Sequence, residues 1–69
     1  MKLSKYLSSL TNPEIDRLEE LLNLTDDEKE VFEHLRKGRS KVYISEKCLI
    51  SVSTVDNRIK AIKEKLNRV

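Results

Sequence analysis

Apolar residues recur at alternating steps of three and four near the C-terminal end of this 69-residue chain. An α-helix completes a turn about every 3.6 residues, so this spacing places all of them along one side of a helix. The pattern therefore predicts a long amphipathic helix, and the rest of the chain has to supply an apolar surface that covers it. The residues of this stripe are Val52, Val55, Ile59, Ile62 and Leu66.

Polar residues mark where this helix and two helices before it begin. Thr25 and Glu28 have the spacing of a capping box, in which the two residues bind each other at the first turn of a helix. Ser40 and Ser51 are suited to cap a short helix and the long helix, and Gly38, the single glycine, suits the left-handed end of the first one. The predicted order is a helix, a short helix, a tight turn and a long helix, which is that of a helix-turn-helix.

Two shorter apolar stripes of helical period lie in residues 1–23, and Thr11 and Glu14 form a second capping-box pair between them. We therefore predict one all-α domain over residues 1–69. In it, an N-terminal helical hairpin precedes a tri-helical helix-turn-helix core over residues 24–69. The apolar residues of the hairpin are Leu3, Tyr6, Leu7, Leu10, Ile15, Leu18, Leu21 and Leu22.

The size of the chain limits what it can do, because a domain of about 60 residues buries only about 60% of its unfolded surface. An enclosed active-site cleft is not expected, and the sequence has no Gly-rich phosphate loop, no pair of catalytic carboxylates and no Ser/His/Asp set. We predict that the chain is not an enzyme and needs no cofactor. No apolar run reaches the length of a membrane span, about 18 residues, so we predict a cytoplasmic protein without membrane contact.

The single cysteine, Cys48, excludes an intramolecular disulfide. It follows Ile44 by one helical turn on the predicted inner side of the short helix. In the sequence, no second cysteine and no nearby histidine would activate it or share a metal ion with it. We therefore predict that Cys48 is a buried apolar residue, that His34 lies at the surface or its edge, and that the chain has no metal site.

Positive charge is concentrated in the second half of the chain. Residues 38–69 contain eight Lys and Arg against three Asp and Glu, whereas residues 1–37 contain six against nine. A basic region of this kind attracts the polyphosphate backbone of a nucleic acid. A solvated helix surface rich in lysine is the alternative, and charge alone leaves both interpretations open.

The face of the long helix opposite its apolar stripe centres on Ser53, Asn57, Lys60, Ala61 and Glu64. In a helix-turn-helix the last helix enters the DNA major groove, where Asn can pair with adenine and Lys with guanine. Cations on both edges of this face suit a helix that lies between two phosphate strands. The residues of the two edges are Asp56 and Lys63 on one side and Thr54, Arg58 and Lys65 on the other.

Several short motifs follow one another between Leu24 and Leu66: L-T at 24–25, E-V at 30–31, G-x-S at 38–40, I-S at 50–51, T-V at 54–55 and I-x-x-K-L at 62–66. Their order and spacing resemble the LuxR/GerE-type DNA-binding domain. The stretch from Ser53 to Asn57 also resembles region four of bacterial sigma factors, which has a related helix-turn-helix. The first resemblance implies a helix-turn-helix fold and double-stranded DNA as the partner.

In the LuxR-type family, the positions that match Asp56, Asn57 and Lys60 usually touch DNA. The resemblance also implies phosphate contacts near Lys41 and from Lys63. Asp56 departs from the lysine that is usual in the family, and its carboxylate is suited instead to accept a hydrogen bond from a cytosine amino group. Cys48 replaces a usual leucine, which is a tolerable change in a small core.

Together these features predict a sequence-specific DNA-binding transcriptional regulator whose helix from about Val52 to Leu66 lies in the major groove. The alternative is a protein-interaction module of the sigma region-four type that contacts RNA polymerase or another regulator. The predicted base-reading residues are Ser53, Asp56, Asn57 and Lys60, and the predicted phosphate contacts are Lys41, Thr54, Arg58, Lys63 and Lys65.

A single short helix-turn-helix reads few base pairs, so specificity commonly comes from a dimer on two half-sites. LuxR-type domains commonly dimerise through a fourth helix, and the sequence stops at Val69 without one. We therefore predict a homodimer joined through residues 1–23. The alternative is that these residues cover the core within one chain. The predicted dimer contacts are Leu3, Tyr6, Leu7, Leu10 and Leu18.

Overall fold

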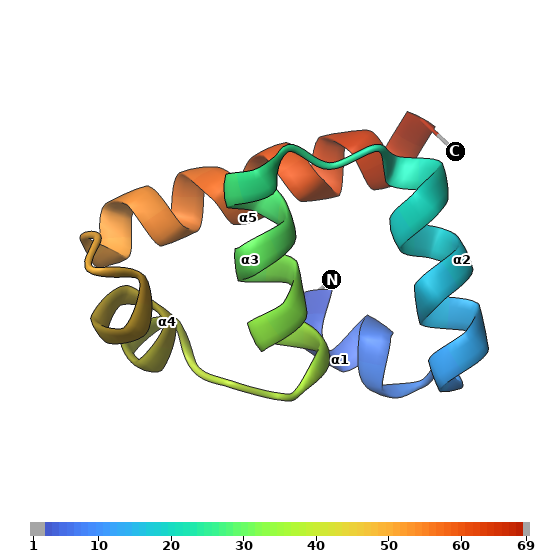
Figure 1. The fold of residues 1–69 in the computed structure, drawn as a ribbon, viewed down its shortest axis with the longest axis horizontal. Coiled ribbons are helices and arrows are strands. Elements are labelled where there is room, and N and C mark those ends of the chain that lie inside the picture. Colours follow the sequence, from blue (N-terminus) through green and yellow to red (C-terminus); the bar gives the residue numbers. More distant parts are fainter. Residues whose placement is uncertain (1–2, 69) are drawn as a thin grey trace.

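The computed structural model describes residues 3–68, which form five α-helices and no β-strand (Figure 1). The predicted all-α fold is confirmed. Met1, Lys2 and Val69, which belong to the predicted domain, lie outside the described residues. None of the described helices is long and apolar enough to cross a membrane. In chain order the helices are α1 (Leu3–Ser8), α2 (Asn12–Leu22), α3 (Asp26–Arg36), α4 (Lys41–Cys48) and α5 (Val52–Arg68).

Both predicted capping boxes are formed, and they start α2 and α3. The backbone N–H of Thr11 donates to Glu14 Oε1 at 2.9 Å, and that of Thr25 donates to Glu28 Oε1 at 3.0 Å. Each threonine Oγ1 accepts the backbone N–H of its glutamate in return. These bonds satisfy backbone donors that have no partner within the first turn of a helix, which is why the helices begin at these residues.

Serine caps start the two helices of the helix-turn-helix. Ser40 Oγ accepts the backbone N–H of Tyr43 at 3.1 Å, and Ser51 Oγ accepts that of Thr54 at 3.1 Å. Between α4 and α5, Leu49 adopts a left-handed conformation with φ of 57°. This conformation costs a residue with a side chain roughly 1 kcal/mol or more, and it produces the tight turn that the sequence predicts.

The apolar stripe of α5 forms the centre of the core. Val55, Ile59 and Ile62 are buried, and α5 packs against α3 and α4 (Figure 1). Val52, at the first turn of α5, is 40% exposed, and Leu66 is only partly buried. The central residues of the predicted stripe therefore provide most of the packing of α5 against the core. The buried residues that α3 and α4 place around it are Val31, Phe32, Leu35 and Ile44.

The two N-terminal helices pack on different parts of the core. α1 contacts α3, whereas α2 contacts α5, and the two helices meet at a corner (Figure 1). The predicted hairpin is therefore opened out, because each apolar stripe packs on a core helix and not on its neighbour in sequence. Leu3 and Leu7 of α1 are buried in this one core. Their assignment as dimer contacts is corrected, since their side chains are covered within a single chain.

A partly buried ion pair ties the C-terminal half of α5 to the start of α3. Lys65 Nζ lies 2.5 Å from Glu28 Oε1 and 3.5 Å from the carbonyl oxygen of Asn23. Glu28 is 8% exposed. The hydrogen bond from Lys65, followed by that from the backbone of Thr25, lowers the pKa of Glu28 below its ordinary value of 4.5. Glu28 therefore stabilises the fold as a carboxylate, in two contacts at once.

We expect Glu28→Gln to lower the free energy of unfolding by roughly 1–3 kcal/mol at neutral pH, because Lys65 loses its charged partner. A glutamine at this position can still form the capping box, so the loss of unfolding free energy measures the contribution of the ion pair. Chemical denaturation followed by circular dichroism measures it.

The matched control is Glu14→Gln, which changes the exposed capping box of α2, where no lysine takes part. We expect a smaller loss from it. Because the pKa of Glu28 is lowered in the folded state, its contribution is present above pH 4.5 and is lost as the pH falls through the folded pKa. An equal loss in the two variants, or a difference that persists in acid, would contradict this role for the ion pair.

Candidate nucleic-acid interface

The outer face of α5 presents polar side chains along its N-terminal half. Ser53, Asn57 and Lys60 are exposed, and they lie opposite the buried stripe of the same helix. Among the described residues, neither Asn57 nor Lys60 has a side-chain hydrogen bond or an ion pair. The structure thus places three of the four predicted base-reading residues on one open face, as the helical period requires.

The fourth predicted base-reading residue, Asp56, forms an ion pair with a predicted phosphate contact. Lys41 Nζ, at the start of α4, lies 2.6 Å from Asp56 Oδ1, and the two side chains are 55% and 43% exposed. An ion pair this exposed contributes only about 0–1 kcal/mol. DNA can therefore compete for both groups, although in the free protein each one neutralises the other.

A groove beside the start of α4 gathers positive charge on one edge of α5. Its polar side chains belong to Arg39, Ser40, Lys41 and Lys63. Buried apolar residues of α1, α3 and α5 form its base. Arg39, which the sequence analysis missed, joins the two predicted cations. Its signal in the sequence was weak, namely a cation directly before the N-cap of a helix whose positive end attracts phosphate.

The other edge of α5 faces the acidic start of α3. Arg58 Nη1 lies 3.3 Å from Asp27 Oδ1, and Lys65 is held by Glu28. The hydroxyl of Thr54 is engaged by the serine that caps α5. Lys65 is therefore removed from the phosphate contacts, because the acidic first turn of α3 occupies its flank. Asp27 is 73% exposed at its side chain, so Arg58 remains free to exchange this partner for a phosphate.

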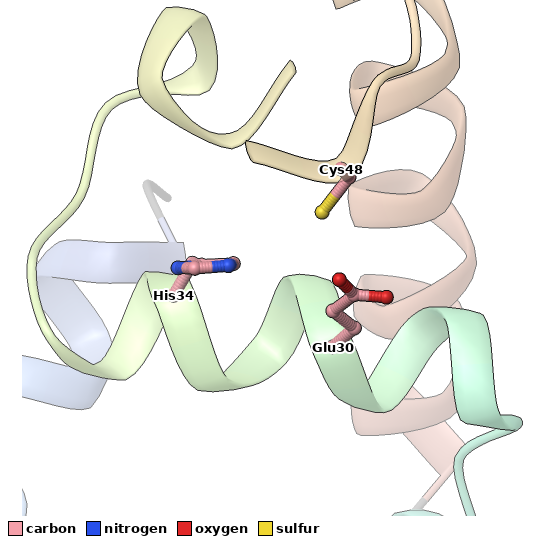
Figure 2. Close-up of side chains that lie close together, drawn as sticks. All are labelled: Glu30, His34 and Cys48. Atoms are coloured by element: carbon pink, nitrogen blue, oxygen red, sulfur yellow. The ribbon is translucent and has the colours of Figure 1, made fainter. Parts of the chain in front are cut away.

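The structure also brings together three residues outside this face. Ligand atoms of Glu30, His34 and Cys48 all lie within 4.8 Å of one another (Figure 2). The prediction that Cys48 has no histidine nearby is wrong, since the end of α4 brings its sulfur close to α3 (Figure 2). Cys48 is partly buried and His34 lies at the edge of the surface. The available signal in the sequence was the spacing of Glu30 and His34 by one turn of the predicted helix.

A capped first helix, a short helix, a tight turn and a long helix with a basic outer face define a helix-turn-helix domain. The profile of a family described as "Bacterial regulatory proteins, luxR family" matches residues 22–68, more than half of the chain. The chain belongs to this family, and it is thus a DNA-binding regulatory domain. The family is one of regulators and not of enzymes. Neither the curated proteins nor the solved structures contain a significant match to the chain.

We expect Asp56→Asn to tighten binding to duplex DNA of random sequence by roughly 2- to 10-fold at low salt, because it releases Lys41 and removes a negative charge from the interface. Fluorescence anisotropy of a labelled duplex measures the change. Glu64→Gln is the matched control, since it removes the same charge from an exposed position of α5 that takes part in no ion pair among the described residues. An equal gain from both variants would show that net charge, and not the release of Lys41, sets the affinity.

Proposed function

We propose that the chain is a sequence-specific transcriptional regulator that places the N-terminal half of α5 in the major groove of DNA. The observation that carries this proposal is the open face of Ser53, Asn57 and Lys60 beside the cations of the α4 groove. Asn57 has the donor and acceptor that match adenine, and Lys60 donates to guanine acceptors. A regulator of this kind acts in the cytoplasm, where bacterial DNA lies.

The phosphate strands would lie along the two edges of this face. On one edge, Arg39, Lys41 and Lys63 surround the start of α4, whose backbone N–H groups also favour an anion. On the other edge, Arg58 and the hydroxyl of Thr54 are the remaining groups within reach. The first edge carries more unshared positive charge, so it is the one expected to dominate affinity.

We expect Asn57→Ala and Lys60→Ala to change the preferred sequence, each at a cost of roughly 1–3 kcal/mol on the best site, because each removes a contact to a base edge. Lys63→Ala should weaken all sequences alike and reduce the slope of log affinity against log salt by about one. Selection from a random duplex library, followed by a salt titration, measures both effects.

Lys65→Ala serves as the control. Because Lys65 binds Glu28, its substitution should leave the slope of log affinity against log salt unchanged. If the Asn57 and Lys60 variants return the wild-type motif, these residues do not read bases. An affinity that does not depend on salt would contradict the whole interface.

We further propose that a second copy of the chain packs on the outer side of α1 and α2. An open hollow between the two helices is lined by Tyr6, Leu10, Leu18 and Leu21 together with the charged Glu14 and Arg17, and Leu21 is 57% exposed. The apolar side chains of this hollow favour contact with another protein surface. A dimer would present two copies of α5 to two half-sites about one DNA turn apart.

We expect Leu21→Lys to shift the chain to a monomer at tens of micromolar, because the charge would have to be buried in the dimer contact. Sedimentation velocity measures the shift. Leu49→Lys is the matched control, since Leu49 is 90% exposed in the turn between α4 and α5 and away from the hollow. A wild-type chain that is already monomeric at this concentration would rule out the dimer.

A second candidate function is contact with RNA polymerase or another regulator. Val42, in the first turn of α4, and Leu49, directly after its end, are 59% and 90% exposed. A protein partner could cover these side chains. If the chain bound no duplex DNA even at low salt, contact with a protein partner would replace DNA binding as the proposed function.

A further inference from the structure

We propose that Glu30, His34 and Cys48 bind a divalent transition-metal cation of the zinc class, which bridges α3 and α4. The carboxylate, imidazole and sulfur ligand atoms lie within 4.8 Å of one another. Figure 2 shows Glu30 and His34 projecting from α3 and the sulfur of Cys48 pointing toward that helix from the end of α4. The proposal concerns a site apart from the DNA-binding face, and it does not rest on it.

The chemical nature of the three ligands determines which class of cation the site would prefer. Thiolate sulfur and imidazole nitrogen favour zinc and related metals over magnesium or calcium, which prefer oxygen ligands. Three protein ligands leave a fourth tetrahedral position for water. Ligand atoms bound to one zinc ion lie about 3.5 Å apart, so the side chains need only a small rotation to close on the ion.

The helical period of α3 places its two proposed ligands close together. Glu30 and His34 are four residues apart, so they stand above each other on one face of α3. The ring of His34 also meets the ring of Tyr43 edge-on, with centroids 5.7 Å apart and an interplanar angle of 68°. Tyr43 belongs to α4, so this contact holds the imidazole against the helix that carries Cys48.

The surroundings of Cys48 argue against a role as a reactive thiol. Burial raises the pKa of Cys48, and the neighbouring carboxylates of Glu30 and Asp27 raise it further, whereas Arg58 opposes them. A nucleophilic or redox-active cysteine has its thiolate stabilised instead. On binding, a cation takes the place of the thiol proton: the S–H bond breaks, a metal–sulfur bond forms, and the proton passes to solvent.

A cation at this place would fix the geometry of the helix-turn-helix. Cys48 is the last residue of α4, directly before the turn that leads to α5. Glu30 lies near the middle of α3 and His34 in its last turn, and α3 packs against α5. A metal bridge would therefore tie the end of α4 to α3, and it would stabilise the folded state because the unfolded chain has no formed site.

Titration of the untagged full chain with Co²⁺ tests the proposal, since a cobalt–thiolate bond gives a charge-transfer band in the near ultraviolet and tetrahedral Co²⁺ gives intense visible bands. We expect both signals to saturate at one equivalent and Zn²⁺ to displace the Co²⁺. Saturating Zn²⁺ should also raise the melting temperature by roughly 5 °C or more.

Cys48→Ala should abolish the charge-transfer band. Glu30→Gln and His34→Gln, both at surface or edge positions, should weaken Co²⁺ binding by roughly 10-fold or more and remain folded even if the Cys48 variant does not. Glu46→Gln is the matched control, because Glu46 is an exposed carboxylate of α4 outside the cluster, and it should bind as the wild type does. The proposal is overturned if the wild type shows no charge-transfer band, or if the Glu30 and His34 variants bind Co²⁺ as tightly as the wild type.

Discussion

The burial of one face of α5 is the interaction on which the rest of the structure depends. Val55, Ile59 and Ile62 each contribute roughly 1.5–3 kcal/mol when their side chains leave water. α3 and α4 pack against this face directly, and α2 joins it further along the helix. Because the stripe occupies one side of α5, its burial also decides which side chains of the helix remain available to a partner. The core and the proposed DNA-binding face are in this sense two results of one periodic pattern.

Electrostatics gives the two edges of α5 different roles. The acidic first turn of α3 holds Arg58 and Lys65, so the cations of this edge serve the fold first. On the opposite edge, near the start of α4, Lys63 and Arg39 take part in no ion pair among the described residues. In the proposed complex a phosphate backbone would therefore meet more unshared positive charge on the α4 side.

The packing of the helices also brings residues that are distant in sequence into small clusters. α3 and α4 both pack against α5, and this arrangement brings the sulfur of Cys48 close to Glu30 and His34. In the N-terminal part, α1 gives Leu3 and Leu7 to the core and leaves Tyr6 and Leu10 at the rim of an open hollow. Each of these features follows from packing, in which every helix covers the nearest uncovered apolar surface.

The sequence by itself determined the helices, their caps, the buried and open faces of α5, and the family of the domain. These features are local, because caps and stripes depend on residues three or four positions apart, and such spacing can be read directly from the chain. Only the tertiary structure decided that Lys65 binds Glu28, that Lys41 pairs with Asp56, and that α1 and α2 diverge. The angles at which helices cross bring these residues together, and those angles depend on how whole surfaces interlock, which no single stretch of the sequence specifies.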